Sequence, residues 1–288
     1  SRDWSSDVCS SDLGRNGARV IGLPEGFIPA HPVWYHHHAA SGKIANDLAV
    51  ELFKNSVEIP GPEIDTLCAA ARDANAYVMI GVCEKIPNTI GTMFNTQVYI
   101  GPDGRLIRKH QKIMPTVGER LVHTGGHGDT FGALQSEFGP MSGLICGENS
   151  NPLAVFALIA EGTRIHVMSW PNHFPTSGDP LRNRVAIDTQ AFAQMSKAFV
   201  ISACGTVDED MIKKLKTGPE GEKFLRDPNC CGGSMIVDPL SRIIAGPMCA
   251  EEGILYADCN LDLGIQMKLR HDFAGHYNRP DIFQLHRS

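Results

Sequence analysis

The sequence lacks the features that mark a membrane protein or a nucleic-acid-binding protein. No run approaches the roughly 18 consecutive apolar residues that a membrane-spanning helix requires. No cluster of basic residues could follow a phosphate backbone, and the 288-residue chain has a net charge of −6. We therefore expect neither a membrane nor a nucleic acid among its partners.

A disulfide framework and a recognisable metal motif are also missing. The nine cysteines are an odd number and lie scattered, and the adjacent pair Cys230-Cys231 has a spacing that rarely forms a bridge. The histidines of YHHHAA (35–40) are consecutive, so they cannot all face one ion, and no cysteine or carboxylate lies nearby at ligand spacing. We expect free thiols, a cytoplasmic location, no metal and no cofactor, with these histidines in a loop at the rim of a pocket.

The first residues differ from the rest of the chain. Residues 1–13, SRDWSSDVCSSDL, have no helical or strand period, and no positive region precedes an apolar core as in a signal peptide. The segment resembles a translated sequencing adaptor, so we interpret residues 1–13 as foreign to the fold. Residues 14–288 contain no linker and no repeat at solenoid spacing, which predicts a single domain.

From Arg15 onward, short apolar runs alternate with helical patterns. The patterns predict helices at 43–55, from 61 to about 71, at 152–161 and at about 182–197. They predict strands at 18–23, 77–83, 94–100, 106–110, 141–145, 164–170, 199–204, 234–238, 241–245 and 253–259. The polar stretch 207–229 reads as a surface excursion. This mixture predicts an α/β fold with layered sheets and outer helices, in which chemistry gathers where strands end.

Cys146 lies where a buried apolar run, 141–145, gives way to a helix that opens at Asn151. A free cysteine at a strand end is often only a small buried hydrophobe. The amides of Gly147 and Glu148, however, lie between a strand end and a helix start, where unpaired N–H groups lower a thiol pKa and hold an oxyanion. Cys146 is therefore a candidate nucleophile, and Gly147 leaves space for a substrate to approach the backbone.

Two charged residues are candidate partners for this thiol. Glu25, in GLPEGFIP, follows an apolar strand and either caps a turn in solvent or lies buried with a partner. Buried beside a thiol, it could act as a general base, because desolvation raises a carboxyl pKa. Lys112, in RKHQKIMPT, belongs either to a solvated basic edge or to a pocket in which its cation stabilises developing negative charge. The three residues carry weight through their combined order along the chain.

Together, these segments resemble the nitrilase (carbon–nitrogen hydrolase) superfamily and, within it, the true nitrilase branch. The resemblance runs from about Gly17 to Leu285 and rests on five blocks in the family's order: LPEGFIPAHPVW, KHQKIMPTVGERLVH, GLICGENSNPLA, GGSMIVDPLSRIIAGP and HYNRPDIF. It implies an α-β-β-α sandwich of two mixed sheets with outer helices. Related amidases and carbamoylases usually carry an aromatic residue and an aspartate where this chain has Gly147 and Glu148.

The resemblance also implies a role for each matching residue. Glu25 is the general base, Lys112 the charge stabiliser and proton donor, and Cys146 the nucleophile of a Glu-Lys-Cys triad. Glu119, in VGERLVH, matches a second glutamate that orients Lys112, and Trp170, in SWPNHF, matches a strand end that lines the substrate pocket. The implied activity is hydrolysis of an organic nitrile to a carboxylic acid and ammonia through a thioimidate and a thioester, without metal or organic cofactor.

Several alternatives remain open within this resemblance. The same triad could hydrolyse amides or carbamoyl groups, or hydrate cyanide, or the chain could be a catalytically inactive member. Family members begin with a strand and a helix before the glutamate strand, and here only residues 14–18 precede it, which leaves open whether those elements are missing. The family also forms homo-oligomers, often dimers extended into spirals, and the expected contacts are the helix after Cys146 and the C-terminal segment.

Overall fold

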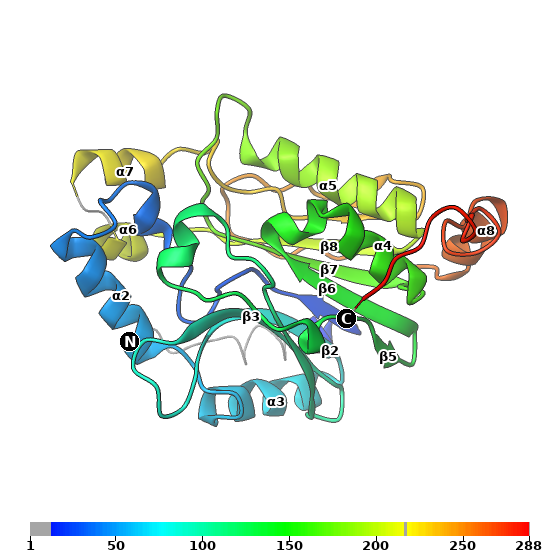
Figure 1. The fold of residues 1–288 in the computed structure, drawn as a ribbon, viewed down its shortest axis with the longest axis horizontal. Helices are drawn as coiled ribbons and strands as arrows, with labels where there is room; N and C mark the ends of the chain where they lie inside the picture. Colours follow the sequence, from blue (N-terminus) through cyan, green and yellow to red (C-terminus); the bar gives the residue numbers. More distant parts are fainter. Residues whose placement is uncertain (1–12, 216–217, 288) are drawn as a thin grey trace.

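Two β-sheets form the centre of the fold in a computed structural model that describes residues 13–215 and 218–287 (Figure 1). The first sheet has four strands in the order β1 (Val20–Gly22), β2 (Tyr77–Lys85), β3 (Met93–Ile100) and β4 (Leu106–Gln111). The second has six, in the order β10 (Ile243–Ala245), β9 (Met235–Val237), β8 (Phe199–Cys204), β7 (Ile165–Trp170), β6 (Gly139–Ile145) and β5 (Leu134–Ser136). Both sheets are mixed, because β1 pairs parallel with β2, and β7 pairs parallel with both β6 and β8, while the remaining pairs are antiparallel.

Helices cover the outer faces of both sheets, which gives four layers (Figure 1). Helix α3 (Pro62–Ala74) packs on the first sheet, and α4 (Pro152–Ala160) and α5 (Leu181–Ser196) pack on the second. At one end lie α2 (Lys43–Asn55), α6 (Glu209–Leu215) and α7 (Pro219–Leu225), and at the other lies α8 (Asp262–Arg270). The predicted α-β-β-α sandwich is confirmed.

The alternation of side chains along β2 explains the layering. Val78, Ile80 and Val82 are buried in the cluster that includes the apolar face of α3. Met79, which points to the opposite face, packs in a separate cluster with Met141 of the second sheet. Because successive side chains of a strand point to opposite faces, one apolar strand can contribute to two layers of core.

Gly143 on β6 allows the two sheets to approach closely. A Cβ atom at this position would lie 2.2 Å from Gln97 Oε1 on β3 and 2.8 Å from the carbonyl oxygen of Val167 on β7. The Gln97 amide crosses between the sheets, donating from Nε2 to Ser169 Oγ at 2.7 Å and accepting from the Tyr99 hydroxyl at 2.8 Å. The spacing of the sandwich here therefore depends on the absence of a side chain.

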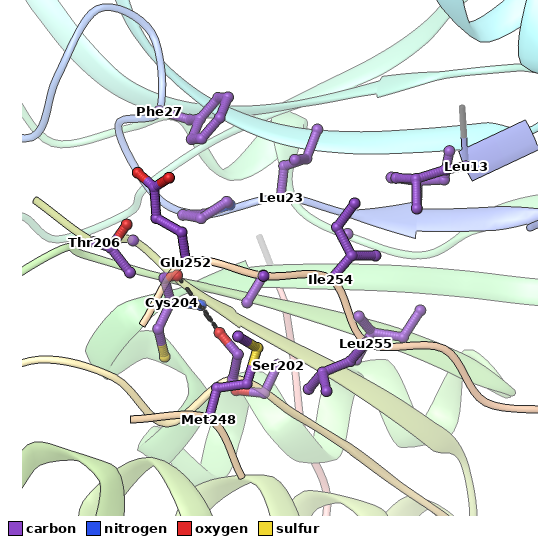
Figure 2. A pocket seen from close by; sticks show the side chains of 18 of the residues that line it. Leu13, Leu23, Phe27, Ser202, Cys204, Thr206, Met248, Glu252, Ile254 and Leu255 are labelled. Carbon is purple, nitrogen blue, oxygen red and sulfur yellow. Dashed lines mark hydrogen bonds between the residues drawn. The ribbon is translucent and has the colours of Figure 1, made fainter. Parts of the chain in front are cut away.

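Strand β1 has a strand neighbour on only one side, β2, within the part of the chain that the structure describes. On its other side lies an open cavity of about 1830 Å³. Figure 2 shows Leu23, which follows β1, on one side of this cavity and Ile254 and Leu255 on another. The prediction of a strand at 253–259 is wrong, because this segment faces the cavity and pairs with no strand among the described residues.

Two further expectations concern the remaining segments. The stretch 207–229, expected to be a surface excursion, contains α6 and α7, whose Ile212, Leu215 and Leu225 are buried in a cluster with α2. The interpretation of residues 1–13 as foreign to the fold falls outside the described residues except at Leu13, whose side chain is buried beside β1 and α3. Within the described ranges, no helix combines the length and apolarity needed to cross a bilayer.

Candidate active site

The three candidate catalytic residues each follow the end of a strand, and their side chains are buried together. Glu25 follows β1 and is 2% exposed, Lys112 follows β4 and is 1% exposed, and Cys146 follows β6 and is 8% exposed. Lys112 Nζ donates hydrogen bonds to Glu25 Oε1 at 2.9 Å and to Glu119 Oε2 at 2.7 Å. The charges of Glu25, Lys112 and Glu119 all act on the Cys146 thiol. The structure thus brings together four residues from separate segments of the chain.

Glu25 has one occupied and one unoccupied carboxylate oxygen. Its backbone N–H donates to the carbonyl oxygen of Trp170 at 3.0 Å, which ties the segment to the end of β7. Oε1 accepts from Lys112 and from Asn95 Nδ2 at 2.6 Å, while Oε2 is buried without a hydrogen-bond partner among the described residues. Burial raises the pKa of Glu25 to about 7 against the opposing effect of Lys112. Glu25 is thereby suited to exchange a proton at neutral pH.

Lys112 and Glu119 form an ion pair beside the Glu25 carboxyl, and both groups stay charged at neutral pH. Burial works to lower the pKa of Lys112, but Glu25, Cys146 and Glu119 together raise it well above its ordinary value. Burial likewise works to raise the pKa of Glu119, but Lys112, His123 and His31 bring it well below its ordinary range. Glu119 lies in the 3-10 turn η2 (Val117–Leu121), where its carboxylate also accepts the N–H of the capping residue at 2.9 Å. Lys112 is therefore a fixed cation and Glu119 a fixed anion.

Cys146 opens the 3-10 turn η4 (Cys146–Ser150) in a left-handed conformation, with φ +52°. A residue with a Cβ atom adopts this region at a cost, and such strain is common at functional sites. The following segment holds the turn in place: Asn149 Nδ2 donates to the Cys146 carbonyl oxygen at 2.9 Å. The local fold therefore presents the thiol at a sharp bend directly after β6.

The sequence predicted that nearby amides lower the pKa of the Cys146 thiol, and this is wrong, because the net shift of that pKa is upward. Burial raises the pKa of Cys146, and Glu25 and Glu119 raise it further, whereas Lys112 and the Gly147 N–H lower it. The dry surroundings and the carboxylates outweigh Lys112 and the single amide, because both disfavour a thiolate. The resting thiol is thus protonated and needs a base at the moment of attack, a role for which Glu25 is placed.

Gly147 and Trp170, the two residues expected to bind the oxyanion or the substrate, differ in exposure and packing. Gly147 is exposed, and a Cβ atom built there would meet only Thr116 Oγ1, at 3.7 Å. Trp170 is 2% exposed and packs in the cluster between β7 and helices α4 and α5, with its Nε1 buried and unpartnered among the described residues. Its carbonyl oxygen positions Glu25, and its predicted contact with substrate remains a prediction.

Sequence reasoning missed several polar residues around the centre. Asn95 Nδ2 donates to Glu25 Oε1 and Glu119 Oε1, both at 2.6 Å, and so joins the two carboxylates. His31 Nδ1 lies 3.7 Å from Glu25 Oε1, too far for a hydrogen bond, while its Nε2 is 3.1 Å from the Tyr35 hydroxyl. Burial lowers the pKa of His31 to about 3, so its ring is neutral. A signal existed for Asn95: it begins three successive polar residues in a strand that is buried throughout.

The consecutive histidines pack against aromatic rings. His36 lies with its ring centroid 5.0 Å from that of Phe174, and His37 lies 5.5 Å from Phe224. Within residues 13–215 and 218–287, no group of three or more His, Cys, Asp or Glu side chains could hold a metal ion. These rings form part of the surroundings of η1 (Val33–His36).

These features are typical of a cysteine hydrolase centre at the strand ends of an α-β-β-α sandwich. A buried thiol has a carboxyl base whose pKa lies near neutrality, and a fixed ammonium that can stabilise charge as it develops. The arrangement suits covalent attack on an electrophilic carbon bonded to nitrogen or oxygen.

Comparisons with known proteins identify the family. The carbon–nitrogen hydrolase family matches residues 8–268, and the chain belongs to this family. It is similar to an aliphatic nitrilase of Sinorhizobium fredii, 34% identical over 95% of this chain and 86% of the relative. It is also similar to a cyanide hydratase of Microdochium sorghi, 33% identical over 96% of this chain and 76% of the relative. Among solved structures, Saccharomyces cerevisiae Nit3 of the nitrilase superfamily shares the fold, with a TM-score of 0.69, 16% identity, and coverage of 95% of this chain and 89% of that chain.

Proposed function

We propose that the protein hydrolyses an organic nitrile to the corresponding carboxylic acid and ammonia. The observation that carries the proposal is the buried set of Glu25, Lys112 and Glu119, linked by hydrogen bonds and acting electrostatically on Cys146. Similarity to proteins named nitrilases supports a nitrile as the substrate class. A nitrile carbon is a weak electrophile, so it calls for a sulfur nucleophile, and its nitrogen becomes more basic as the new bond forms.

The first half of the reaction forms a covalent adduct. Glu25 Oε2 takes the proton from Cys146 as Sγ bonds to the nitrile carbon, and Glu25 then returns that proton to the nitrogen. Lys112 and the Gly147 N–H stabilise the charge that develops. Because the pKa of Cys146 is raised and that of Glu25 is about 7, proton transfer is unfavourable alone and proceeds together with carbon–sulfur bond formation. The product of this half is a thioimidate.

The second half releases ammonia and the acid. Water adds to the thioimidate carbon while Glu25 takes its proton, and the tetrahedral intermediate expels ammonia, which leaves a thioester. A second water attacks this thioester, the carbon–sulfur bond breaks, and Cys146 regains its proton. If the first tetrahedral intermediate expels sulfur instead of nitrogen, the product is an amide.

The direct test is turnover of a nitrile panel by the purified protein. We expect ammonia release with at least one of benzonitrile, phenylacetonitrile, mandelonitrile, an aliphatic dinitrile or cyanide, and loss of turnover in Cys146→Ala. The matched control is Cys230→Ala, since Cys230 is a similarly buried cysteine, ahead of β9, that forms no part of the proposed centre. Ammonia release at the original rate by Cys146→Ala would show that the nucleophile is wrongly assigned.

The same panel addresses the neighbouring activities. Amide accumulation alongside acid measures the partition of the tetrahedral intermediate, and formamide from cyanide would indicate the reaction for which one relative is named. Ammonia from amides or carbamoyl compounds, with none from any nitrile, would replace the proposal with the amidase or carbamoylase alternative. Selective labelling of Cys146 with no turnover of any kind would indicate an inactive member.

We also propose a homo-oligomer in which α4 and the C-terminal segment make contacts. Leu153 on α4 is 64% exposed, and Ile282 and Phe283 near the C-terminus are 57% and 73% exposed. Large apolar side chains exposed in this way are typical of association surfaces. Light scattering on the protein and on Leu153→Lys tests this, and an unchanged mass in the variant would place the contact elsewhere.

For the compartment, we propose the cytoplasm. The cysteines that the structure describes are all free, which suits a reducing environment. Recovery of the protein mainly from the periplasmic or secreted fraction of producing cells would contradict this proposal.

A further inference from the structure

Glu148 is a buried carboxylate that takes no part in the proposed reaction, yet it contacts both segments that carry catalytic groups. It lies in η4, two residues after Cys146, and is 8% exposed. Its Oε1 accepts the backbone N–H of Ile113 at 2.7 Å. Its Oε2 accepts the backbone N–H of Ile145 at 3.0 Å and is 2.9 Å from His110 Nε2. One side chain therefore has partners on the first sheet and on the second.

These partners lie directly beside the catalytic residues in the chain. Ile113 follows Lys112, and Ile145 precedes Cys146. The two backbone N–H groups converge on a single carboxylate, so two hydrogen bonds, of 2.7 and 3.0 Å, link the segment of Lys112 to that of Cys146. Hydrogen bonds to a charged acceptor are shorter and stronger than neutral ones, and they fix geometry more tightly.

We propose that Glu148 is a positioning residue whose carboxylate holds the Lys112 segment against the Cys146 segment and so sets where the ammonium lies relative to Glu25 and the thiol. The part of this inference that concerns catalysis rests on the proposed function. The part that concerns geometry does not, because it depends only on the contacts of Glu148.

The direction of a pH shift separates this role from a merely structural one. Lys112 lowers the pKa of Glu25, so an ammonium that moves away lets that pKa rise above its value of about 7. Loss of the negative charge at position 148 would by itself act in the opposite direction, because a nearby anion disfavours ionisation of a carboxyl group. An upward shift therefore reports displacement of Lys112. The other titratable groups around Glu25 remain unchanged in the variant: Glu119, His31, Cys146, Tyr35, Cys83 and Cys204.

The experiment uses Glu148→Gln, which keeps the shape of the side chain but removes one of its two acceptor oxygens. The rate of Cys146 alkylation by iodoacetamide, followed by mass spectrometry of the modified peptide, is measured from about pH 5 to pH 9. The alkylation rate should fall on the acid side of the profile as Glu25 becomes protonated. We expect the midpoint of this acid limb to move upward by about one pH unit. With a nitrile that the wild type turns over, we expect kcat to fall about 100-fold with little change in KM, as for a misplacement of about 1 Å. Glu148→Asp, which keeps the charge, should restore part of both effects.

Glu84→Gln is the matched control. Glu84 is 1% exposed and accepts hydrogen bonds from Thr96 Oγ1 at 2.8 Å and Gln111 Nε2 at 3.0 Å, so it too holds the end of β4. None of its described hydrogen bonds reaches η4. We expect Glu84→Gln to lower thermal stability without moving the alkylation limb.

Each outcome decides between the possibilities. The positioning role would be overturned if folded Glu148→Gln kept the acid limb of the alkylation profile at its wild-type pH. An equal shift of that limb in Glu84→Gln would overturn it too. If Glu148→Gln fails to fold, Glu148→Asp provides the test, because the shorter side chain cannot keep both contacts. A wild-type acid limb and a wild-type kcat in Glu148→Asp would overturn the positioning role. A shifted limb in a protein that hydrolyses no nitrile would leave the positioning role intact and refute the proposed function.

Discussion

At the scale of single residues, the two oxygens of Glu25 have different environments. Oε1 accepts hydrogen bonds from Lys112 and Asn95, while Oε2 has no partner among the described residues and is the atom we assign to proton transfer. Burial raises the pKa of Glu25 to about 7, so the base form of this group becomes dominant only above neutral pH. The acid limb of kcat/KM should therefore lie near pH 7, well above the ordinary range of a glutamate.

The Asn95→Ala variant tests this assignment. Asn95 donates to the charged form of Glu25 and so lowers its pKa, and its removal raises the pKa further. We expect the acid limb to move upward by about one unit, with a fall of about tenfold in kcat/KM on the acid side. A pH–rate profile on the best nitrile measures both.

Thr96→Ala is the control for Asn95→Ala. Thr96 is the next residue on β3, is equally buried, and donates to a different carboxylate, Glu84, at 2.8 Å. Its loss should leave the acid limb in place. An identical shift in both variants would mean that the limb reports general loosening of β3.

Gly147 makes a second prediction at this scale. A Cβ atom there would lie 3.7 Å from Thr116 Oγ1, an ordinary contact, and the backbone is outside the left-handed region, so we expect Gly147→Trp to fold. The indole would occupy space beside the thiol, and we expect kcat/KM for bulky nitriles to fall about 100-fold, with a much smaller loss for small aliphatic ones. Competition assays between benzonitrile and a short aliphatic nitrile give this ratio, and equal losses for both would contradict the assignment.

Residues of the centre could be predicted from sequence where they stand in recognisable blocks. Glu25, Lys112 and Cys146 follow strand ends in such blocks, Glu119 lies in the turn η2 of the same block as Lys112, and the structure brings the four together. The role of Asn95 was not predicted, because it depends on β3 lying between β2 and β4, and that pairing is a tertiary property. The direction of the Cys146 pKa was also beyond sequence reasoning, since it depends on the balance of burial against several charges.

At the scale of elements, the close approach of β6 to β3 depends on Gly143. A methyl group there would overlap Gln97 Oε1 and the Val167 carbonyl oxygen, and backbone cannot yield easily. We expect Gly143→Ala to lower the free energy of unfolding by about 1–3 kcal/mol, as for other overpacked cores. Urea unfolding followed by circular dichroism measures this.

Gly147→Ala is the control for Gly143→Ala, since the same methyl group there would make only an ordinary contact, 3.7 Å from Thr116 Oγ1. Its unfolding midpoint should stay close to that of the wild type. Equal destabilisation by the two variants would show that the sheets do not depend on Gly143 for their spacing.

Whether an element could be predicted depended on where its partners lie. The helix 43–55 and the strand 199–204 were predicted with the bounds they have in the structure, because their apolar periodicity is local. The strand at 253–259 failed because a strand needs a hydrogen-bonded neighbour, and this segment borders the cavity beside β1. Helices α6 and α7 were missed because they are short and polar, with a few side chains buried by contacts with distant segments.

At the scale of the whole molecule, neutral histidines that are buried or partly buried make the fold sensitive to acid. Burial lowers the pKa of His31 and His166 to about 3 and of His36 and His173 to about 4, from 6.5. Below pH 6.5 the unfolded chain binds protons at these positions and the folded chain does not, so stability falls as the pH falls. Glu25 acts oppositely between pH 4.5 and about 7, because its folded form binds the proton more tightly. The combined effect of the four histidines on the free energy of unfolding is larger than the opposing effect of Glu25.

We therefore expect the free energy of unfolding to decrease between pH 7 and pH 5 by on the order of several kcal/mol. Urea midpoints at a series of pH values, converted with a constant m-value, give the slope. A stability that stays level or increases over this interval would show that these histidines are not held neutral in the folded protein.

Glu25 and Lys112 follow strands of one sheet, and Cys146 follows a strand of the other. During synthesis, the ribosome releases the first two residues well before the strands that surround the nucleophile. The proposed reaction centre consequently forms only once both halves of the chain have docked, since neither half contains all three residues. Proton transfer between Glu25 and Cys146 in the proposed reaction thus depends on completion of the tertiary structure.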